Sequence, residues 1–320
     1  MKPDAQAPAG GRDGAAQLRA RVAALEREVA RREEFIQRVI TSRPYRVWRA
    51  LKRACGRGHQ GLRCPPVEAP APRPVAPPPA AAPAPVGSPR RTPSRGELGL
   101  RLSGVGVDIS PLHSPVATDP QRSRVYYVDR LEAEQIRRHY PNMVERGLVM
   151  PDVVCDGGAG LAFGDSTLNF IIASHLLEHV HDPIGALRAW HRALRPGGHL
   201  LMVVPDPGRC ADRSRLVTPI DHLIADHEAP SAERDLEHFR EWAQFWDKCA
   251  DGLAIEARAR KLVEMGYAIH YHDWSAATLA QAMQCVQERY GCHWRGLVIP
   301  DVASAEGFVG LWEKLGSASG

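Results

Sequence analysis

The sequence LNFIIASHLLEHVHDPIGALRAWHRALRPGGHLLMVVPD, residues 168–206, decides the fold. It opens and closes with short apolar runs at residues 170–173 and 200–204, which are typical of strands buried on both faces. Residues 184–194 between them carry apolar side chains at helical spacing, and a Pro-Gly-Gly turn ends that helix. Strand, helix and strand together predict a right-handed βαβ unit with parallel strands.

Polar residues stand where each of these strands ends. Ser174, His175 and Glu178 follow the first strand, and Asp206 follows the second. In open parallel sheets, ligands bind beyond the carboxyl ends of the strands. We therefore expect the chemistry of this protein at that edge of the sheet.

Three upstream segments predict further parallel strands, and each carries an acid near its carboxyl end. The segments are residues 104–109, 124–129 and 152–156, with Asp108, Asp129 and Asp156. An acid after the second strand can accept both hydroxyls of a ribose, and one after the third can accept an adenine amino group. The three acids therefore predict a cleft that binds a nucleoside.

The remaining elements predict an α/β, doubly wound and mostly parallel sheet. We expect helices over residues 131–139, 232–245 and 276–289, and a closing antiparallel pair of strands over residues 294–299 and 307–312. The connection after the first strand is short and broken by prolines, so its usual helix is expected to be reduced or missing.

The net charge of +4 hides an asymmetry along the chain. Residues 1–95 hold 19 Lys and Arg against 7 Asp and Glu, a net charge of +12, whereas the remainder carries −8. An acidic globular part disfavours nucleic acid as its substrate.

The sequence favours a reduced, cytoplasmic chain. Its seven cysteines are scattered and include no C-x-x-C pair. It also lacks the apolar core of a signal peptide and an apolar run long enough to cross a membrane.

The N-terminal arm is predicted to be disordered over residues 1–14 and helical over residues 15–63. An apolar a/d seam with a single break at Arg32 runs through residues 15–41, which favours a coiled coil and a homodimer. Residues 43–63 are basic with interleaved aromatic side chains, a pattern that can contact an anionic membrane surface. The alternative for residues 15–41 is a lone amphipathic helix, and the alternative for residues 43–63 is a solvated helix end.

A linker and a globular domain follow the arm. Residues 64–97 are rich in Pro and Ala, so we expect an extended spacer without ordered structure. The globular domain is predicted over residues 98–320. Within it, residues 208–265 or so are rich in His, Asp, Glu and Arg and predict a helical insertion over the site.

Several of these motifs together resemble the class I S-adenosylmethionine-dependent methyltransferases. The matching stretches are GVGVDISPLHSP, RVYYVDR, DVVCDGG, the sequence of residues 168–206, and TPIDHLIADHE. The resemblance covers about residues 104–315 and is closest to the type 11 methyltransferase-like domains found with glycan-assembly and glycosyltransferase proteins. It implies a Rossmann-like, seven-stranded sheet with a reversed final hairpin and S-adenosylmethionine as cofactor. It also implies a glycan or related small-molecule acceptor, and a glycosyltransferase as partner.

The resemblance also assigns roles to individual residues. It places Gly106, Asp108 and Ser110 in the first cofactor motif, Asp129 at the ribose, Asp156 near the adenine, and Ser174 and His175 beside the sulfonium. The sequence departs from the family after Asp108, where Ser110, Leu112 and Ser114 replace three glycines. That departure leaves a second hypothesis open, a catalytically inactive scaffold on the same fold in a glycan-assembly complex.

A sugar hydroxyl acceptor would profit from a general base, and the candidates for this catalytic role are His175 and His222. An amine or carboxylate acceptor would not need one.

Metal binding is the competing interpretation of the histidine motifs. His175, Glu178 and His179 match the H-x-x-E-H pattern of zinc metalloproteases, which requires the motif inside a helix. The preceding strand and the following Asp-Pro disfavour that helix. His270 and His272 alternate as on one face of a strand, but two ligands are too few for a closed zinc site. We therefore predict no metal site from the sequence.

Overall fold

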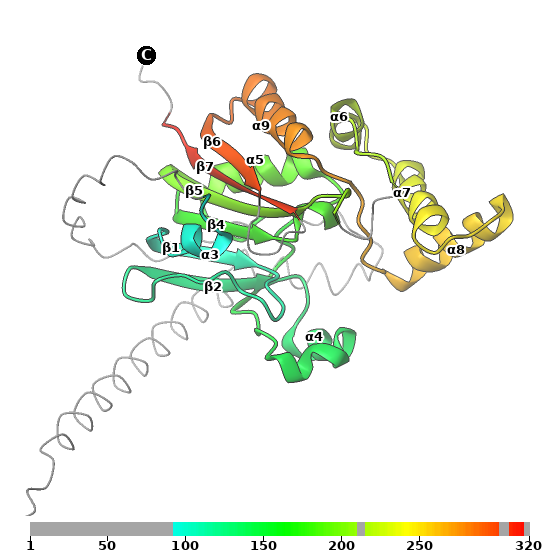
Figure 1. Ribbon diagram of the computed structural model, residues 1–320, viewed down its shortest axis with the longest axis horizontal. Helices are drawn as coiled ribbons and strands as arrows, with labels where there is room; N and C mark the ends of the chain where they lie inside the picture. The colour runs from blue at the N-terminus through cyan, green and yellow to red at the C-terminus, as the bar shows by residue number, and fades with distance from the viewer. Residues whose placement is uncertain (1–91, 210–214, 301–306, 317–320) are drawn as a thin grey trace, which may run out of the picture.

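The computed structural model describes residues 92–209, 215–300 and 307–316. Their seven strands form one sheet, in the order β3-β2-β1-β4-β5-β7-β6 (Figure 1). The strands are β1 (Gly104–Ile109), β2 (Ser123–Asp129), β3 (Val153–Val154), β4 (Leu168–Ser174), β5 (Leu194–Pro205), β6 (Trp294–Pro300) and β7 (Gly307–Lys314). The first five strands of this order, β3, β2, β1, β4 and β5, pair in parallel, whereas β7 runs antiparallel to both β5 and β6. The predicted mostly parallel sheet with a reversed final hairpin is confirmed.

The described helices form two groups, one along the sheet and one in the insertion. Those of the sheet are α3 (Arg95–Gly99), α4 (Ala133–His139), α5 (Pro183–Ala193) and α9 (Ala276–Tyr290). Two short 3₁₀ turns are η2 (Pro141–Arg146) and η3 (Leu177–His179), and the insertion contains α6 (Ile220–Glu228), α7 (Ala232–Phe245) and α8 (Gly252–Met265). Figure 1 shows α5 and α9 side by side over the sheet, with α6, α7 and α8 grouped beyond one end of it. None of the described helices is both long enough and apolar enough to cross a membrane.

The main core lies between the sheet and the pair α5 and α9. Helix α5 begins at Pro183 after the N-cap Asp182, whose carboxylate accepts a hydrogen bond of 2.7 Å from Gly185 N. Its apolar face is fully buried, and the Trp190 indole donates a 2.8 Å hydrogen bond to the carbonyl of Gly157. This bond connects α5 to the loop after β3, where a candidate ligand-binding residue, Asp156, lies.

The opposite face of the sheet has a thinner covering. Residues 110–122, between β1 and β2, form no helix, as the prolines predict. Helix α3 instead places Leu98 in the second hydrophobic cluster, with Val116 of the loop and Phe170 of β4. Ser94 caps α3 through a capping box with Glu97. Helix α3 therefore lies across the boundary that the sequence predicts at residue 97, between the linker and the globular domain.

The insertion has its own small core. Its apolar side chains come from α7, α8 and the segment before α9, namely Leu236, Phe239, Trp242, Ala259, Leu262 and Ile269. Arg215, which is buried, forms an ion pair of 2.9 Å with Asp273 and donates a 2.9 Å hydrogen bond to the carbonyl of His270. These contacts hold the start of the insertion against residues 269–273.

The predicted disordered segment, the coiled coil and the basic helix fall within residues 1–91. They lie outside the described residues, as does most of the predicted linker.

Candidate functional site

Four adjacent strands end along one edge of the sheet and bring the predicted cofactor residues together. The strand order β3-β2-β1-β4 aligns Asp156, Asp129, Asp108 and Ser174 in succession at this carboxyl edge. His175 follows Ser174 directly. We call these five residues the strand-end rim. This alignment is the arrangement that the sequence predicts for a nucleoside cleft.

The backbone at the rim adopts the left-handed conformation at residues other than glycine. Ser110 and Leu112, after β1, have φ of 51° and 49°, and His175, after β4, has φ of 50°. These three are among the five non-glycine residues with positive φ in the described part of the chain. Such strained residues concentrate at functional sites. The loop after β1 thus keeps a glycine-like backbone at two of the three positions where its sequence lacks the family's glycines.

Hydrogen bonds to the neighbouring strands hold this backbone in place. Ser110 N donates to the carbonyl of Val128 at 2.7 Å, and His175 N donates to the carbonyl of Val203 at 2.8 Å. Each bond joins a strained residue to the strand next to its own, so the sheet itself supports the conformation.

Asp108 is the most deeply buried acid of the rim, with an exposed fraction of 1%. Its Oδ2 accepts a 3.2 Å hydrogen bond from Val116 N, whereas its Oδ1 is buried without a hydrogen-bond partner. Burial raises the pKa of Asp108 to about 7, partly opposed by the Val116 bond and by the charge of Arg95. Arg95, at the start of α3, also donates to Ser114 Oγ at 3.3 Å, so a cation borders the first loop. The sequence gives no sign that Arg95 belongs to the site, because this residue stands inside the predicted linker.

Asp129 and Asp156 differ in their exposure. Asp129 is buried and accepts a 2.8 Å hydrogen bond from Leu131 N. Burial raises its pKa, although the Leu131 bond and the Ser110 hydroxyl act in the opposite direction. Asp156 is exposed, and its Oδ1 accepts bonds from Gly158 N and Ala159 N at 3.0 and 3.1 Å. This turn fixes Asp156 at the end of the rim.

Gly106 lies inside β1, where an added Cβ would overlap the ring of Phe170. Its lack of a side chain thus serves the packing between β1 and β4, and its place is in the strand rather than in the loop that follows. Ser174 is buried at the end of β4, paired in register with Val203 of β5.

His175 and Glu178 form a pair next to the rim. His175 Nδ1 lies 3.4 Å from Glu178 Oε1, with 38% of the His175 side chain exposed and only 2% of that of Glu178. Burial by itself raises the pKa of Glu178, but His175, His179 and His270 outweigh it, so the pKa lies below its usual value. Glu178 is therefore an ionised carboxylate that can orient His175. Glu178 is recognisable in the sequence as part of the H-x-x-E-H motif, but its place behind His175 is visible only in the structure.

The H-x-x-E-H motif lacks the geometry of a metalloprotease. Residues 177–179 form only the 3₁₀ turn η3, and α5 does not begin until Pro183. His179 instead points its Nδ1 to the carbonyl of Ile269 at 2.9 Å. The alternative of a helical zinc-protease motif is therefore wrong, because the turn does not place the two histidines on one helical face.

His222, the second predicted base, lies on α6 beside three residues that the sequence analysis did not combine. They are Asp226 of α6, His238 of α7 and His272. The expected strand over His270 and His272 is wrong, because residues 267–275 form no regular strand. The ring of His270 packs on that of His179, with centroids 4.6 Å apart, while His272 contacts Asp226. Only tertiary packing could bring this cluster together, since its members are up to 50 residues apart in sequence.

Comparisons with known proteins identify a family. A family model described as a methyltransferase domain matches residues 96–287, more than half of the chain. A curated relative, an uncharacterized 37.1 kDa protein of a transposon in Streptomyces fradiae, is 32% identical over 114 residues. These residues are 35% of this chain and 31% of that protein, so the match spans about a third of the relative.

The solved structures that the chain matches are more distant in sequence. A SAM-dependent methyltransferase of Thermotoga maritima, described as a possible histamine N-methyltransferase, is 15% identical, with a TM-score of 0.35 over 66% of this chain and 82% of that one. A SAM-dependent methyltransferase of Methanosarcina mazei is 16% identical, with a TM-score of 0.35 over 68% of this chain and 95% of that one.

Proposed function

The chain belongs to the methyltransferase domain family, and we propose that it transfers a methyl group from S-adenosylmethionine to a hydroxyl of a glycan or related small molecule. The observation that supports this best is the strand-end rim, where three acids stand at the carboxyl ends of three adjacent strands. The backbone beside them is left-handed at Ser110, Leu112 and His175.

The rim fits the chemistry of the cofactor. S-adenosylmethionine presents an ammonium group, two ribose hydroxyls and an adenine amino group, all of which are donors. The rim presents carboxylates, and one of their oxygens, Asp108 Oδ1, is buried without a hydrogen-bond partner. A buried acceptor of this kind is costly unless a ligand supplies a donor. Acceptors on the protein therefore match donors on the ligand.

Each part of the cofactor has a candidate residue. Asp129 would hold the ribose hydroxyls, and Asp156 the adenine amino group. Asp108 suits the ammonium of the methionine part, because a positive charge beside this buried carboxyl favours its ionised form. Arg95 suits the carboxylate of the same part, since opposite charges pair. When bound, the cofactor supplies an electrophilic methyl group on a sulfonium. What the protein contributes is then the alignment of the acceptor with that group.

His175 is the proposed general base. It stands directly after β4, partly exposed, with the buried Glu178 carboxylate 3.4 Å behind its Nδ1. A carboxylate in this position favours the tautomer with a proton on Nδ1, which leaves Nε2 free to accept the proton of a hydroxyl. This pairing is the reason for preferring a hydroxyl acceptor to an amine. His222, the other predicted base, lies instead on α6 next to Asp226, in the insertion.

Calorimetric titration with S-adenosylmethionine tests the cofactor assignment. The parent chain should bind it, and Asp129→Ala should weaken binding about 10- to 100-fold, because charged hydrogen bonds contribute about 1.5–3 kcal/mol. Asp119→Ala is the matched control, since Asp119 lies at the opposite edge of the sheet, in the turn before β2. Unchanged affinity in Asp129→Ala would refute the ribose assignment.

The same titration also tests the alternative hypothesis that the domain is a catalytically inactive scaffold. No detectable binding by the parent at millimolar S-adenosylmethionine would contradict methyl transfer and favour the scaffold. The loop after β1 argues against that outcome, because it retains left-handed backbone where the family has glycines.

A further inference from the structure

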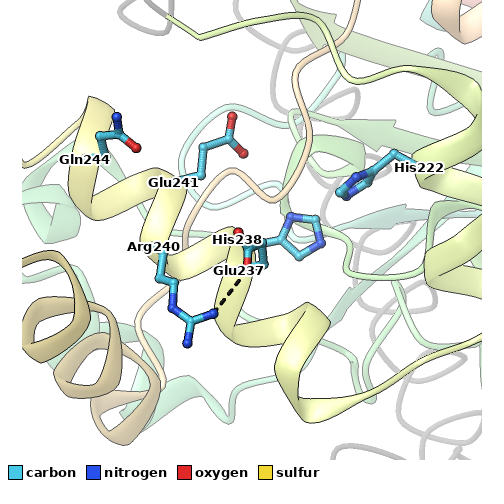
Figure 2. Close-up of a pocket in the computed structure, with 6 residues that line it drawn as sticks. All are labelled: His222, Glu237, His238, Arg240, Glu241 and Gln244. Carbon is cyan, nitrogen blue, oxygen red and sulfur yellow. Dashed lines mark hydrogen bonds and ion pairs between the residues drawn. The ribbon is translucent and has the colours of Figure 1, made fainter. Parts of the chain in front are cut away.

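The insertion contains a cluster of three imidazoles around one carboxylate oxygen. Asp226 Oδ2 lies 3.1 Å from His222 Nε2, 3.3 Å from His238 Nε2 and 3.0 Å from His272 Nε2. All four side chains approach within 4.8 Å of one another through these atoms. We call these four residues the His₃Asp cluster. Figure 2 shows the His238 ring projecting from α7 toward His222 on α6.

Local structure explains how four distant residues meet. His222 and Asp226 are four residues apart on α6 and share one of its faces. His238 is a buried residue of α7. His272 is fully buried in the segment before α9, which is bound to the turn after β4 through a 2.7 Å hydrogen bond from Tyr271 N to the carbonyl of Glu178. The cluster therefore joins the insertion to the turn that carries the H-x-x-E-H motif.

The hydrogen bonds of two histidines assign their tautomers. His272 Nδ1 lies 3.1 Å from the carbonyl of Val180, and His238 Nδ1 lies 3.1 Å from the carbonyl of Tyr271. A carbonyl only accepts, so both Nδ1 atoms carry the proton. In a neutral imidazole the Nε2 atom then has a lone pair, and both lone pairs face the same oxygen of Asp226.

His272 Nε2 lies at hydrogen-bond distance, 3.0 Å, from Asp226 Oδ2, but a neutral imidazole that donates from Nδ1 has no proton on Nε2 to donate to this carboxylate. His222 Nε2 and His238 Nε2 are buried and lack a hydrogen-bond partner of suitable geometry, although each approaches Asp226 Oδ2 closely. Facing lone pairs repel unless a cation lies between them. An Nδ1–H bonded to a carbonyl, with Nε2 directed inward, is the arrangement of metal-binding histidines.

Arg234 fixes the remaining oxygen of the carboxylate. Its Nε and one terminal nitrogen lie 2.8 and 2.6 Å from Asp226 Oδ1. Oδ1 is thereby occupied, and Oδ2 is directed toward the three imidazoles. Ligating carboxylates are commonly held by such outer hydrogen bonds.

We propose that His222, Asp226, His238 and His272 bind one divalent transition-metal ion, with Zn²⁺ as the best fit. Zinc prefers four tetrahedral ligands at about 2.0–2.1 Å, which places neighbouring ligand atoms roughly 3.3 Å apart. The three distances from Asp226 Oδ2 to the imidazole nitrogens, 3.0–3.3 Å, are close to that spacing, and all four ligand atoms lie within 4.8 Å of one another. Three imidazole nitrogens disfavour Mg²⁺ and Ca²⁺, which prefer oxygen ligands.

The site has four protein ligands and is closed, so the ion stabilises structure. It holds α6 and α7 against the segment before α9, and through that segment against the turn after β4. An entry path exists at His222, whose side chain is 35% exposed and borders a polar hollow of about 220 Å³. This proposal does not depend on the methyl-transfer proposal.

Metal titration of the full chain, purified without a histidine tag and treated with a chelator, tests the proposal. Calorimetry with ZnCl₂ alone should show one equivalent of high-affinity binding. Co²⁺ should give the intense visible absorption of a four-coordinate site. His222→Ala should weaken Zn²⁺ binding by about 100-fold or more, because it removes one of four ligands. His227→Ala, on the same helix, is the matched control, since His227 pairs with Asp182 outside the cluster.

Three results would overturn the proposal. The parent could fail to bind Zn²⁺, or His222→Ala could bind as tightly as His227→Ala. Binding could also survive His222→Ala and be lost in His270→Ala, which would move the ion to Glu178, His179 and His270, the second group of convergent ligands in the described residues. His222 is partly exposed, so its variant is expected to fold, and circular dichroism verifies this for each variant.

Discussion

Asp108 illustrates how a single buried side chain connects stability to ligand binding. Its carboxyl is almost fully buried and has a partner for only one oxygen. Sequence position alone predicted that an acid would stand at this strand end. Its burial follows from the loop of residues 110–122, which closes over it through Val116, and this closure is a tertiary effect.

The raised pKa of Asp108 predicts that the stability of the fold depends on pH. The folded protein keeps the proton up to about pH 7, whereas the unfolded chain releases it near 3.8. Between these values the folded state binds more protons, so the stability contributed by this group is complete below pH 3.8 and is lost as pH rises through 7. Asp108→Asn should remove this dependence, worth at most about 4 kcal/mol at roughly 1.4 kcal/mol per pH unit.

Urea unfolding of the parent and of Asp108→Asn from pH 4 to pH 8 measures the difference. The variant should gain stability relative to the parent as pH rises. Asp119→Asn, at the opposite edge of the sheet, should not show this trend. Parallel pH profiles of the parent and Asp108→Asn would contradict the raised pKa.

His175 and Glu178 carry the catalytic prediction. His175→Ala should lower kcat by 10²- to 10⁴-fold, the usual contribution of a general base, and leave cofactor affinity within a few fold. Glu178→Gln should cause a smaller loss of kcat and change its pH profile, because Glu178 acts by positioning His175. Methyl transfer to hydroxyl-bearing sugars, measured with labelled cofactor, is the readout. Equal rates for parent and His175→Ala would remove His175 from the mechanism.

At the scale of elements, the loop after β1 departs most from its family pattern. The prolines in its sequence correctly predicted that no helix would follow β1. The sequence did not reveal that Ser110 and Leu112 would adopt the left-handed conformation, which glycine adopts without strain and other residues do not. Glycines would adopt this backbone without support. Here the hydrogen bond from Ser110 to β2 and the contact of Val116 with Asp108 hold the loop in the left-handed conformation.

Substitutions at Ser110 test this conformation. Ser110→Gly should change stability by less than about 1 kcal/mol, because relief of strain offsets the greater freedom of the unfolded chain. It should also retain cofactor binding. Ser110→Val should lose about 1–2 kcal/mol or more, since a β-branched residue is poorly tolerated at positive φ.

Thermal or urea unfolding measures these changes. Ser114→Val is the control, because Ser114 belongs to the same loop without a left-handed backbone. If Ser110→Val and Ser114→Val are equally stable, Ser110 does not have the conformation described.

In the insertion the helix α7 was predictable from the sequence, whereas its contacts with other elements were not. The sequence predicted α7 over residues 232–245, and the structure has it at those residues. The cluster that α7 forms with α6 was not predicted, since amphipathic pattern determines which face of a helix is buried and does not identify its neighbours. His238 had no local signal of function, and His272 was read together with His270 rather than with Asp226.

At the scale of the whole molecule, the N-terminal arm of residues 1–63 supplies a prediction about assembly. Its a/d pattern predicts a parallel or antiparallel dimer of the full chain. Leu25→Glu with Val29→Glu should reduce the chain to a monomer, because charges are not tolerated in a coiled-coil seam. Light scattering with size-exclusion chromatography gives the mass. Arg27→Glu, away from the seam, is the control, and a parent that is already monomeric would contradict the prediction.

The parallel pairing of the strands was predictable because local rules constrain it. A buried strand, a helix and a second buried strand allow essentially one handedness, and acids at strand ends then align at one edge. These rules act within about 40 residues, so residues 168–206 and the three upstream strands sufficed for the fold and for most of the rim. The identification of Arg95 failed for a related reason, since compositional bias toward proline continues up to the start of α3 and conceals a short helix.

The sequence by itself determined the parallel sheet, the reversed hairpin and the acids along its carboxyl edge, because periodicity and strand-end residues are local properties of the chain. Only the tertiary structure decided that Glu178 supports His175, that the glycine-poor loop keeps its left-handed backbone, and that three histidines from α6, α7 and the segment before α9 surround Asp226. Each of these depends on side-chain directions and on contacts between distant segments, which the packing of the insertion against the sheet establishes.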